Sequence, residues 1–207
     1  MLPKFHSPNC CLQQEIDWGK YFIKGRDAEN KPLNLSETGE FLSARDKSRH
    51  GTHTLSTGGG NFMKNASIYR HVKGIAKGGA PHARVASYKV CWPTDSVGYN
   101  CYDADILAAF DEGIHDGVDV FSVFLGGQPL IPDYFQDSIS IGSFHAVQKG
   151  RVVVCSASNS GPFPATVVNV APWIITVGAS SMDRAYPSSV HLGNNITYIV
   201  STVYWHS

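Results

Sequence analysis

The sequence has 207 residues and a mass of 22.5 kDa, and its 17 basic and 17 acidic side chains give a formal net charge of zero. This balance excludes a general electrostatic attraction to nucleic acid or to an anionic membrane. The length suits one domain, and 43% hydrophobic residues with a mean hydropathy of −0.14 predict a globular fold. No apolar run approaches the roughly 20 residues of a membrane span, and no signal peptide is visible.

The cysteines and the glycosylation sequons indicate one cellular compartment, and the missing signal peptide indicates another. The five cysteines fit no zinc template. Three Asn-x-Ser/Thr sequons make Asn34, Asn65 and Asn195 candidate glycosylation sites. Cys91 and Cys101 can close a short disulfide loop worth about 2–3 kcal/mol in an oxidising compartment, and two free thiols remain the alternative. These features favour a secretory context, the absence of a signal does not, and the sequence leaves the conflict open.

The first part of the chain is irregular. Residues 1–48 mix Pro, Asn, Gly and charged residues with little periodicity, so we expect loops and short strands there. A short run typical of a β-strand follows at residues 84–90. Regular structure is therefore expected mainly in the second part of the chain.

Residues 103–117 predict a helix. Asp103 or Asp105 can cap its start, and Gly117 can take the left-handed conformation that follows a helix C-terminus. The apolar residues at helical spacing are Ile106, Leu107, Phe110 and Ile114.

Strands and helices alternate after that helix. Strands are expected at residues 118–125, 151–156 and 173–178, with a second helix at residues 137–150. The apolar run at residues 152–154 fits a strand buried on both faces. This order predicts an α/β fold with a parallel sheet. In such sheets the functional sites lie just past the carboxyl ends of the strands.

One segment carries the strongest functional signal. Residues 49–58 read Arg-His-Gly-Thr-His-Thr-Leu-Ser-Thr-Gly. This segment resembles the catalytic-histidine signature of the subtilisin-like serine proteases, the subtilases, in which the first His of the pattern, here His50, is the general base. A structural His at a helix start is the alternative. Further segments resemble the plant, cucumisin-like branch of that family: residues 78–92, 103–111, 114–120, 143–146, 160–162, 169–173 and 177–180.

The resemblance covers residues 20–198 and implies a fold and a domain organisation. The implied fold is α/β and subtilisin-like, mainly a parallel β-sheet with helices on both faces, here incomplete. Residues 1–48 would be the irregular N-terminal part of the catalytic domain. Residues 49–198 would be the core of a partial catalytic domain of the peptidase S8 type. Residues 199–207 would form a divergent tail, because the family pattern is lost from residue 198 onward.

The resemblance also assigns an oxyanion donor. The triplet Ala157-Ser158-Asn159 stands where the family has Ala-Gly-Asn, so Asn159 would donate to the developing oxyanion. Loss of one such donor costs about 3 kcal/mol, and a subtilisin is the example on which that figure rests. Ser158 replaces the Gly at the pocket wall, where its Cβ would crowd the substrate, or be strained if a positive φ is needed. A simple turn residue is the alternative for Asn159.

A substrate-binding edge is implied at residues 122–127. This stretch resembles the family's Ser-Leu-Gly-Gly edge, which pairs with an extended peptide by β-augmentation. Phe124, Leu125 and Gly126, together with Ser158, are therefore the predicted substrate-binding residues. Phe124 stands where the family usually has Ser, and its ring would either fill part of the specificity pocket or turn into the core.

The other parts of a catalytic triad are not evident. The family's Gly-Thr-Ser-Met nucleophile motif is absent, and residues 178–180 match a structural segment instead. Asp17, followed by Trp-Gly, superficially resembles the family's acid motif. The match of residues 21–25 to a stretch beyond the true acid makes Asp17 a surface carboxylate instead. The resemblance thus implies serine endopeptidase chemistry, while the chain by itself is expected to have little or no activity.

No cofactor is expected, and the partner implied is an extended peptide or protein substrate, not nucleic acid. A metal site is not expected, because the pair His50 and His53 has no third ligand at a suitable spacing. The resemblance implies an extracellular or cell-wall location. The competing hypothesis is a catalytically inactive truncated subtilase that binds peptides, or a non-functional truncation product. A dinucleotide-binding domain is excluded, because no G-x-G-x-x-G follows a strand.

Overall fold

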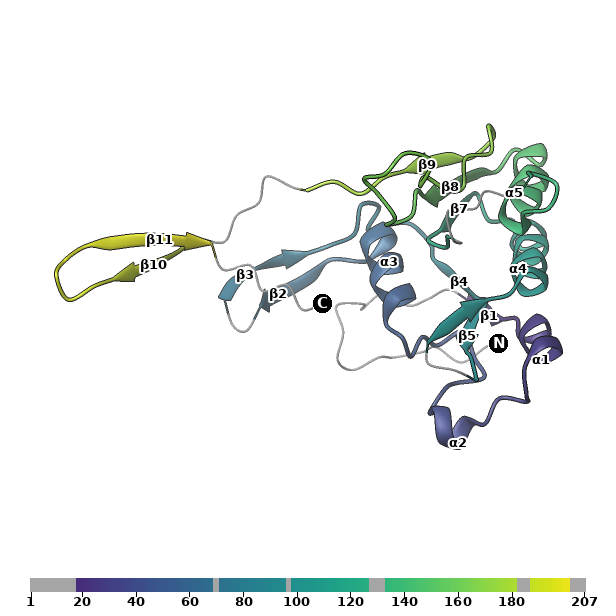
Figure 1. Ribbon diagram of the computed structural model, residues 1–207, viewed down its shortest axis with the longest axis horizontal. Coiled ribbons are helices and arrows are strands. Elements are labelled where there is room, and N and C mark those ends of the chain that lie inside the picture. Colours follow the sequence, from purple (N-terminus) through teal and green to yellow (C-terminus); the bar gives the residue numbers. More distant parts are fainter. Residues whose placement is uncertain (1–17, 69–70, 96–97, 127–132, 182–186, 202–207) are drawn as a thin grey trace.

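A computed structural model describes residues 18–68, 71–95, 98–126, 133–181 and 187–201 (Figure 1). The helices are α1 (Lys24–Glu29), α2 (Leu35–Thr38), α3 (His50–Gly59), α4 (Asp103–His115) and α5 (Ser138–Gln148). The strands are β1 (Trp18–Tyr21), β2 (Met63–Ile68), β3 (His71–Ala76), β4 (Ala86–Lys89), β5 (Cys91–Pro93), β6 (Tyr99–Cys101), β7 (Val120–Val123), β8 (Val152–Ser156), β9 (Ile175–Val177), β10 (Pro187–His191) and β11 (Thr197–Ser201). No helix in the described ranges is long and apolar enough to cross a membrane.

Parallel strands form the centre of the fold, as predicted. Strands β7, β8 and β9 make a three-stranded parallel sheet, and β1 pairs with β4 in a second parallel ladder. Val120 lies opposite Val152, and Val154 lies opposite Ile175. The α/β class is therefore confirmed, and the carboxyl ends of the three sheet strands lie at a common edge.

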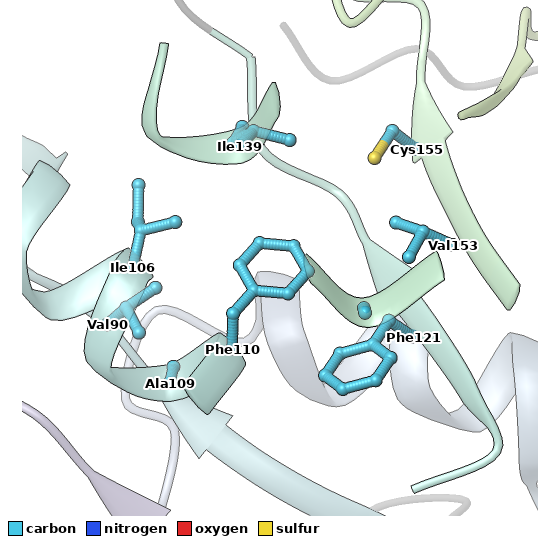
Figure 2. Close-up of a cluster of buried hydrophobic side chains, with 9 residues drawn as sticks. Val90, Ile106, Ala109, Phe110, Phe121, Ile139, Val153 and Cys155 are labelled. Carbon is cyan, nitrogen blue, oxygen red and sulfur yellow. The ribbon is translucent and has the colours of Figure 1, made fainter. Parts of the chain in front are cut away.

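Helices α4 and α5 lie side by side against one face of this sheet (Figure 1). Figure 2 shows the core between them, in which the Phe110 ring of α4 stacks near the Phe121 ring of β7, with centroids 5.3 Å apart. The close approach of the two helices needs Gly142, because a Cβ there would lie 2.3 Å from Cδ2 of Phe110. The buried core residues are Val90, Ile106, Ala109, Phe110, Phe121, Ile139, Ala146, Val153 and Cys155.

The opposite face of the three-stranded sheet is exposed in the described part of the chain. Val120 of β7 is 57% exposed, Val152 of β8 is 43% exposed, and Val177 of β9 is 52% exposed. The expectation that residues 152–154 are buried on both faces is therefore wrong. The run is apolar throughout, yet only the side of Val153 meets α4 and α5.

The ends of α4 differ in part from the prediction. Gly117 follows the helix at φ 80°, as expected. Asp103 and Asp105 do not cap the helix start, where Tyr102 is the N-cap residue. The buried Asp105 carboxylate instead accepts the backbone N–H groups of Gly25 (2.8 Å) and Arg26 (3.1 Å). The cap prediction is wrong because this carboxylate attaches α1 to α4.

The N-terminal part is more regular than expected. Within residues 18–48 the chain forms β1 and the two short helices α1 and α2, where loops and short strands were predicted. Asn34 caps α2 by accepting the N–H groups of Ser36 (3.1 Å) and Glu37 (3.4 Å). Asp17 lies outside the described residues.

Among the residues that the structure describes there are also three antiparallel hairpins, formed by β2 with β3, β5 with β6, and β10 with β11. The hairpin of β10 and β11 projects away from the rest of the molecule (Figure 1). Cys91 and Cys101 face each other in the second hairpin and form the expected disulfide, with an S–S distance of 2.01 Å. Cys155 is buried and carries no disulfide, and burial raises the pKa of its thiol to about 12.

Candidate active site

Helix α3 presents His50 at its first residue. The preceding Arg49 adopts a left-handed conformation with φ 71°, and its side chain does not cap the helix. The half-buried Asp46 takes that role. Its carboxylate accepts the backbone N–H groups of Arg49 (3.0 Å) and Thr52 (2.8 Å) and the hydroxyl of Ser48 (3.0 Å). Asp46 thus determines where α3 begins and where His50 stands, a role that the sequence analysis missed.

The electrostatics of Asp46 match this capping role. Burial alone would raise the pKa of its carboxyl, but the hydrogen bonds from Thr52, Ser48 and Arg49 outweigh burial and hold the pKa below its usual value. Asp46 is therefore a carboxylate near neutral pH. A negative charge at this end also interacts favourably with the helix dipole.

The far end of α3 is attached to residues 78–80. The N–H of Gly78 donates to the carbonyl of Gly60 (2.7 Å), and the N–H of Gly79 donates to the carbonyl of Thr57 (2.9 Å). A Cβ on Gly78 would lie 2.4 Å from the nitrogen of Gly60, so only glycine permits this approach. The helix carrying His50 is thus held at both ends.

The His50 side chain itself is exposed, and its ring makes no hydrogen bond with any residue that the structure describes. Neither an orienting acid nor a nucleophile contacts it there. His53 is also exposed. Within the described ranges no group of three or more His, Cys, Asp or Glu side chains is arranged to hold a metal ion.

The segment after β7 carries the residues predicted to bind substrate. Phe124 is 46% exposed, so its side chain does not turn into the core, and a place in the specificity pocket stays a prediction. Leu125 is half-buried, and its carbonyl accepts a hydrogen bond from the side-chain amide of Asn169 (2.7 Å). Gly126 is exposed at the end of this segment.

The loop after β8 lies against that edge. A Cβ built on Gly126 would lie 3.7 Å from the Cβ of Ser158, so the two segments are in close proximity. Ser158 has a φ of 74°, the left-handed value at which a serine is strained relative to glycine by about 1 kcal/mol. Its hydroxyl lies 3.2 Å from that of Ser160. Asn159 is exposed and its side chain makes no hydrogen bond to another described residue, so its amide is available to a ligand.

Asn169 is a second residue that the sequence analysis did not single out. It occurred there only within residues 169–173, one of the segments that carry the family resemblance. In the structure it is 8% exposed, and its amide nitrogen donates to the carbonyls of Leu125 (2.7 Å) and Ser156 (2.8 Å). It therefore joins the segment after β7 to the end of β8.

The candidate glycosylation sites all lie on the surface. Asn34, Asn65 and Asn195 are exposed. At Asn34 the side-chain oxygen accepts the capping hydrogen bonds and a hydrogen bond from the hydroxyl of Ser36 (2.7 Å). The disulfide between Cys91 and Cys101 is consistent with the secretory pathway.

Comparison with known proteins assigns the family. The family model described as "Subtilase family", Peptidase_S8, matches residues 10–198. The chain belongs to the subtilase family. Subtilisin-like protease SBT5.3 of Arabidopsis thaliana is 58% identical over 179 residues, and SBT3.5 of the same plant is 48% identical over 204 residues. Subtilisin-like serine-protease S of Lotus japonicus is 48% identical over 192 residues. The plant subtilase resemblance seen in the sequence is thereby confirmed.

The match covers most of this chain but a small part of its relatives. It includes 86% of this chain and 22% of SBT5.3, 97% of this chain and 26% of SBT3.5, and 92% of this chain and 24% of the Lotus protease. The chain thus spans about a quarter of the length of these subtilases. The solved structure of Sphericase matches 89% of this chain and 57% of its own, at 22% identity and a TM-score of 0.47, which adds nothing to the family assignment.

Proposed function

We propose that this chain supplies the general base, the oxyanion donor and one peptide-binding edge of a subtilisin-like serine endopeptidase site. In this proposal His50 takes the proton of a nucleophilic serine, and Asn159 donates to the oxyanion. Leu125 and Gly126 align an extended peptide. None of the family motifs in these 207 residues supplies the nucleophilic serine, since no Gly-Thr-Ser-Met occurs among them.

One observation carries the proposal. The predicted edge and the predicted oxyanion loop follow neighbouring parallel strands, β7 and β8, and meet where Gly126 approaches Ser158. A peptide carbonyl bound along the edge would therefore lie beside the loop that carries the uncommitted amide of Asn159. The sequence separates these segments by about 30 residues, so only the parallel fold accounts for their proximity.

The geometry of the edge suits an extended peptide. The carbonyl of Leu125 is directed inward, where Asn169 donates to it. Successive residues of an extended chain direct their polar groups to opposite sides, so the polar groups of Phe124 and Gly126 are left for a ligand. The exposed side chain of Phe124 would lie at the entrance of the specificity pocket. It would make that entrance narrower than the serine that the family usually has at this position.

A second candidate function is peptide binding without cleavage. It is favoured by the His50 ring, which makes no hydrogen bond to a carboxylate or a hydroxyl among the residues placed by the structure. Without a complete triad a protease retains only the small rate enhancement of its oxyanion hole and binding site.

We propose a location outside the cell, in the plant cell wall, with glycans at Asn34, Asn65 or Asn195.

The test uses the whole 207-residue chain. A fluorophosphonate probe reports an activated serine, a fluorogenic peptide library reports cleavage, and His50→Ala is the control. For the chain alone we expect no labelling and no turnover, but saturable binding of a proline-free peptide. Labelling that is lost in His50→Ala would show that the chain contains its own nucleophile and would support the endopeptidase directly. A folded chain that neither cleaves nor binds peptides would contradict both functions.

A further inference from the structure

Asn169 occupies an unusual place for a polar side chain. It lies outside every strand, between β8 and β9, and is only 8% exposed. Its φ of 56° is left-handed, a conformation that asparagine tolerates better than most residues. A buried amide in a left-handed backbone is costly unless its hydrogen-bonding groups are satisfied, so its partners explain its presence.

Those partners are the Leu125 carbonyl, just after β7, and the Ser156 carbonyl, at the end of β8. The regular ladder between β7 and β8 ends at the pair Val123 and Cys155. Beyond it, the N–H of Ala157 turns to β9 and donates to the carbonyl of Val177 (2.9 Å). The carbonyl of Leu125 therefore has no N–H of β8 to accept.

The side chain of Asn169 takes over where the ladder stops. Its nitrogen donates to the carbonyl of Leu125 (2.7 Å) and to the carbonyl of Ser156 (2.8 Å). Both partners are acceptors, so the amide orientation is determined, because only the NH₂ end can satisfy two carbonyls. The Ser156 hydroxyl also reaches the Leu125 carbonyl, but at 3.5 Å it is a weak contact.

The backbone around Asn169 is held just as firmly. Thr176 of β9 donates its hydroxyl to the Asn169 carbonyl (2.5 Å), and the N–H of Val168 donates to the carbonyl of Ala157 (3.3 Å). The side chain of Val168 packs beside Gly126, since a Cβ on Gly126 would lie 3.2 Å from its Cγ2. Residues 168–169 thus contact both the substrate edge and the loop that carries Asn159.

We propose that Asn169 is a positioning residue that sets the substrate edge at Phe124–Gly126 and the oxyanion loop at residues 157–159 relative to each other. The inference rests on the proposed function, because the two segments matter together only if a peptide binds across them. Asn169 touches no substrate in this account. It acts by keeping two backbone carbonyls, one just after β7 and one at the end of β8, at a constant separation.

The test compares three variants of the whole chain. Asn169→Gly keeps the left-handed backbone accessible and removes the amide. Asn169→Asp keeps the shape but places carboxylate oxygens against two carbonyls. Asn195→Gly is the matched control, since Asn195 has a similar φ of 63° in an exposed turn.

The first readout combines hydrogen exchange at the amide of Ala157, which donates to the Val177 carbonyl (2.9 Å), with the backbone amide chemical shift of Gly126. For Asn169→Gly we expect exchange about ten-fold faster at Ala157 and a displaced Gly126 signal, from the loss of one to two hydrogen bonds. The amides of α4 and α5 should be unchanged, Asn169→Asp should have the larger effect, and Asn195→Gly should have none. Unchanged exchange, a change at only one segment, or loss of protection in α4 and α5 as well would overturn the positioning role.

The second readout is binding of a proline-free fluorescent peptide. We expect Asn169→Gly to weaken binding about ten-fold and Asn195→Gly to leave it unchanged. Accelerated exchange with unchanged affinity would overturn the inference. A wild-type chain that binds no peptide would overturn the proposed function instead, and the exchange data would then still decide whether Asn169 joins the two segments.

Discussion

Replacing Asp46 by alanine should loosen the start of the helix that carries His50. The carboxylate accepts two backbone N–H groups, from Arg49 and Thr52, and hydrogen bonds to a charged group are worth about 1.5 kcal/mol or more each. Because Asp46 is half-exposed, we reduce the sum to about 2 kcal/mol, within the range of lost N-terminal caps. That corresponds to roughly 30-fold faster hydrogen exchange at the amide of Thr52.

Two further variants and a change of pH test the capping role of Asp46. Asp46→Asn can accept with one oxygen only and should show about half the effect in free energy, while Ser48→Ala should change it by less than about 0.5 kcal/mol. The pKa of Asp46 is lowered in the folded state, so its contribution is present above the usual aspartate pKa of about 3.9 and is lost as the pH falls through the lower folded value. Equal exchange at Thr52 in wild type and Asp46→Ala at pH 7 would refute the capping role.

Three further predictions concern stability and modification. Replacing both Cys91 and Cys101 by serine should lower the free energy of unfolding by about 3 kcal/mol in a urea titration, and a loss below about 0.5 kcal/mol would contradict a stabilising disulfide. Burial alone would raise the pKa of the Glu40 carboxyl, but the hydrogen bond from Lys89 (2.6 Å) and those from Phe41 and Tyr99 hold the pKa below its usual value. Glu40→Gln should therefore destabilise the chain by about 3 kcal/mol at pH 7, and its unfolding free energy should fall less between pH 5 and pH 3 than that of wild type; parallel pH profiles would disprove the pairing. When the chain is expressed in a plant secretory host, Asn34→Gln should lower its mass by one N-glycan, which peptide N-glycosidase removes from the wild type. An unchanged mass would show that Asn34 is not glycosylated.

Local sequence patterns predicted the regular second part of the chain because its signals are local. The helical spacing from Ile106 to Ile114 and the left-handed Gly117 needed no distant partner. The N-cap of α5 at Asp137, which the sequence analysis did not name, is a local signal of the same kind, since its carboxylate accepts the N–H groups of residues just after it. The motif segments placed the candidate edge and loop at the ends of the correct strands.

The parts that were missed depend on partners distant in the sequence. Asp105 is an ordinary cap candidate by pattern, but in the fold it accepts N–H groups from residues about 80 positions away. Asn169 joins carbonyls 44 and 13 residues away, which no periodicity reveals. Burial also needed the structure, because the apolar run at residues 152–154 does not show which of its faces is covered in the described part of the chain.

The most direct measurement of the central claim is a titration of the isotope-labelled 207-residue chain with a proline-free extended peptide, followed by the shifts of its backbone and side-chain amides. We expect saturable shifts at the Gly126 amide, at the loop of Ser158 and at the Asn159 side-chain amide. Small or absent shifts are expected in the hairpin of β10 and β11. Shifts confined to that hairpin, or to the exposed face of the β7–β9 sheet, would contradict a peptide-binding edge at Leu125–Gly126.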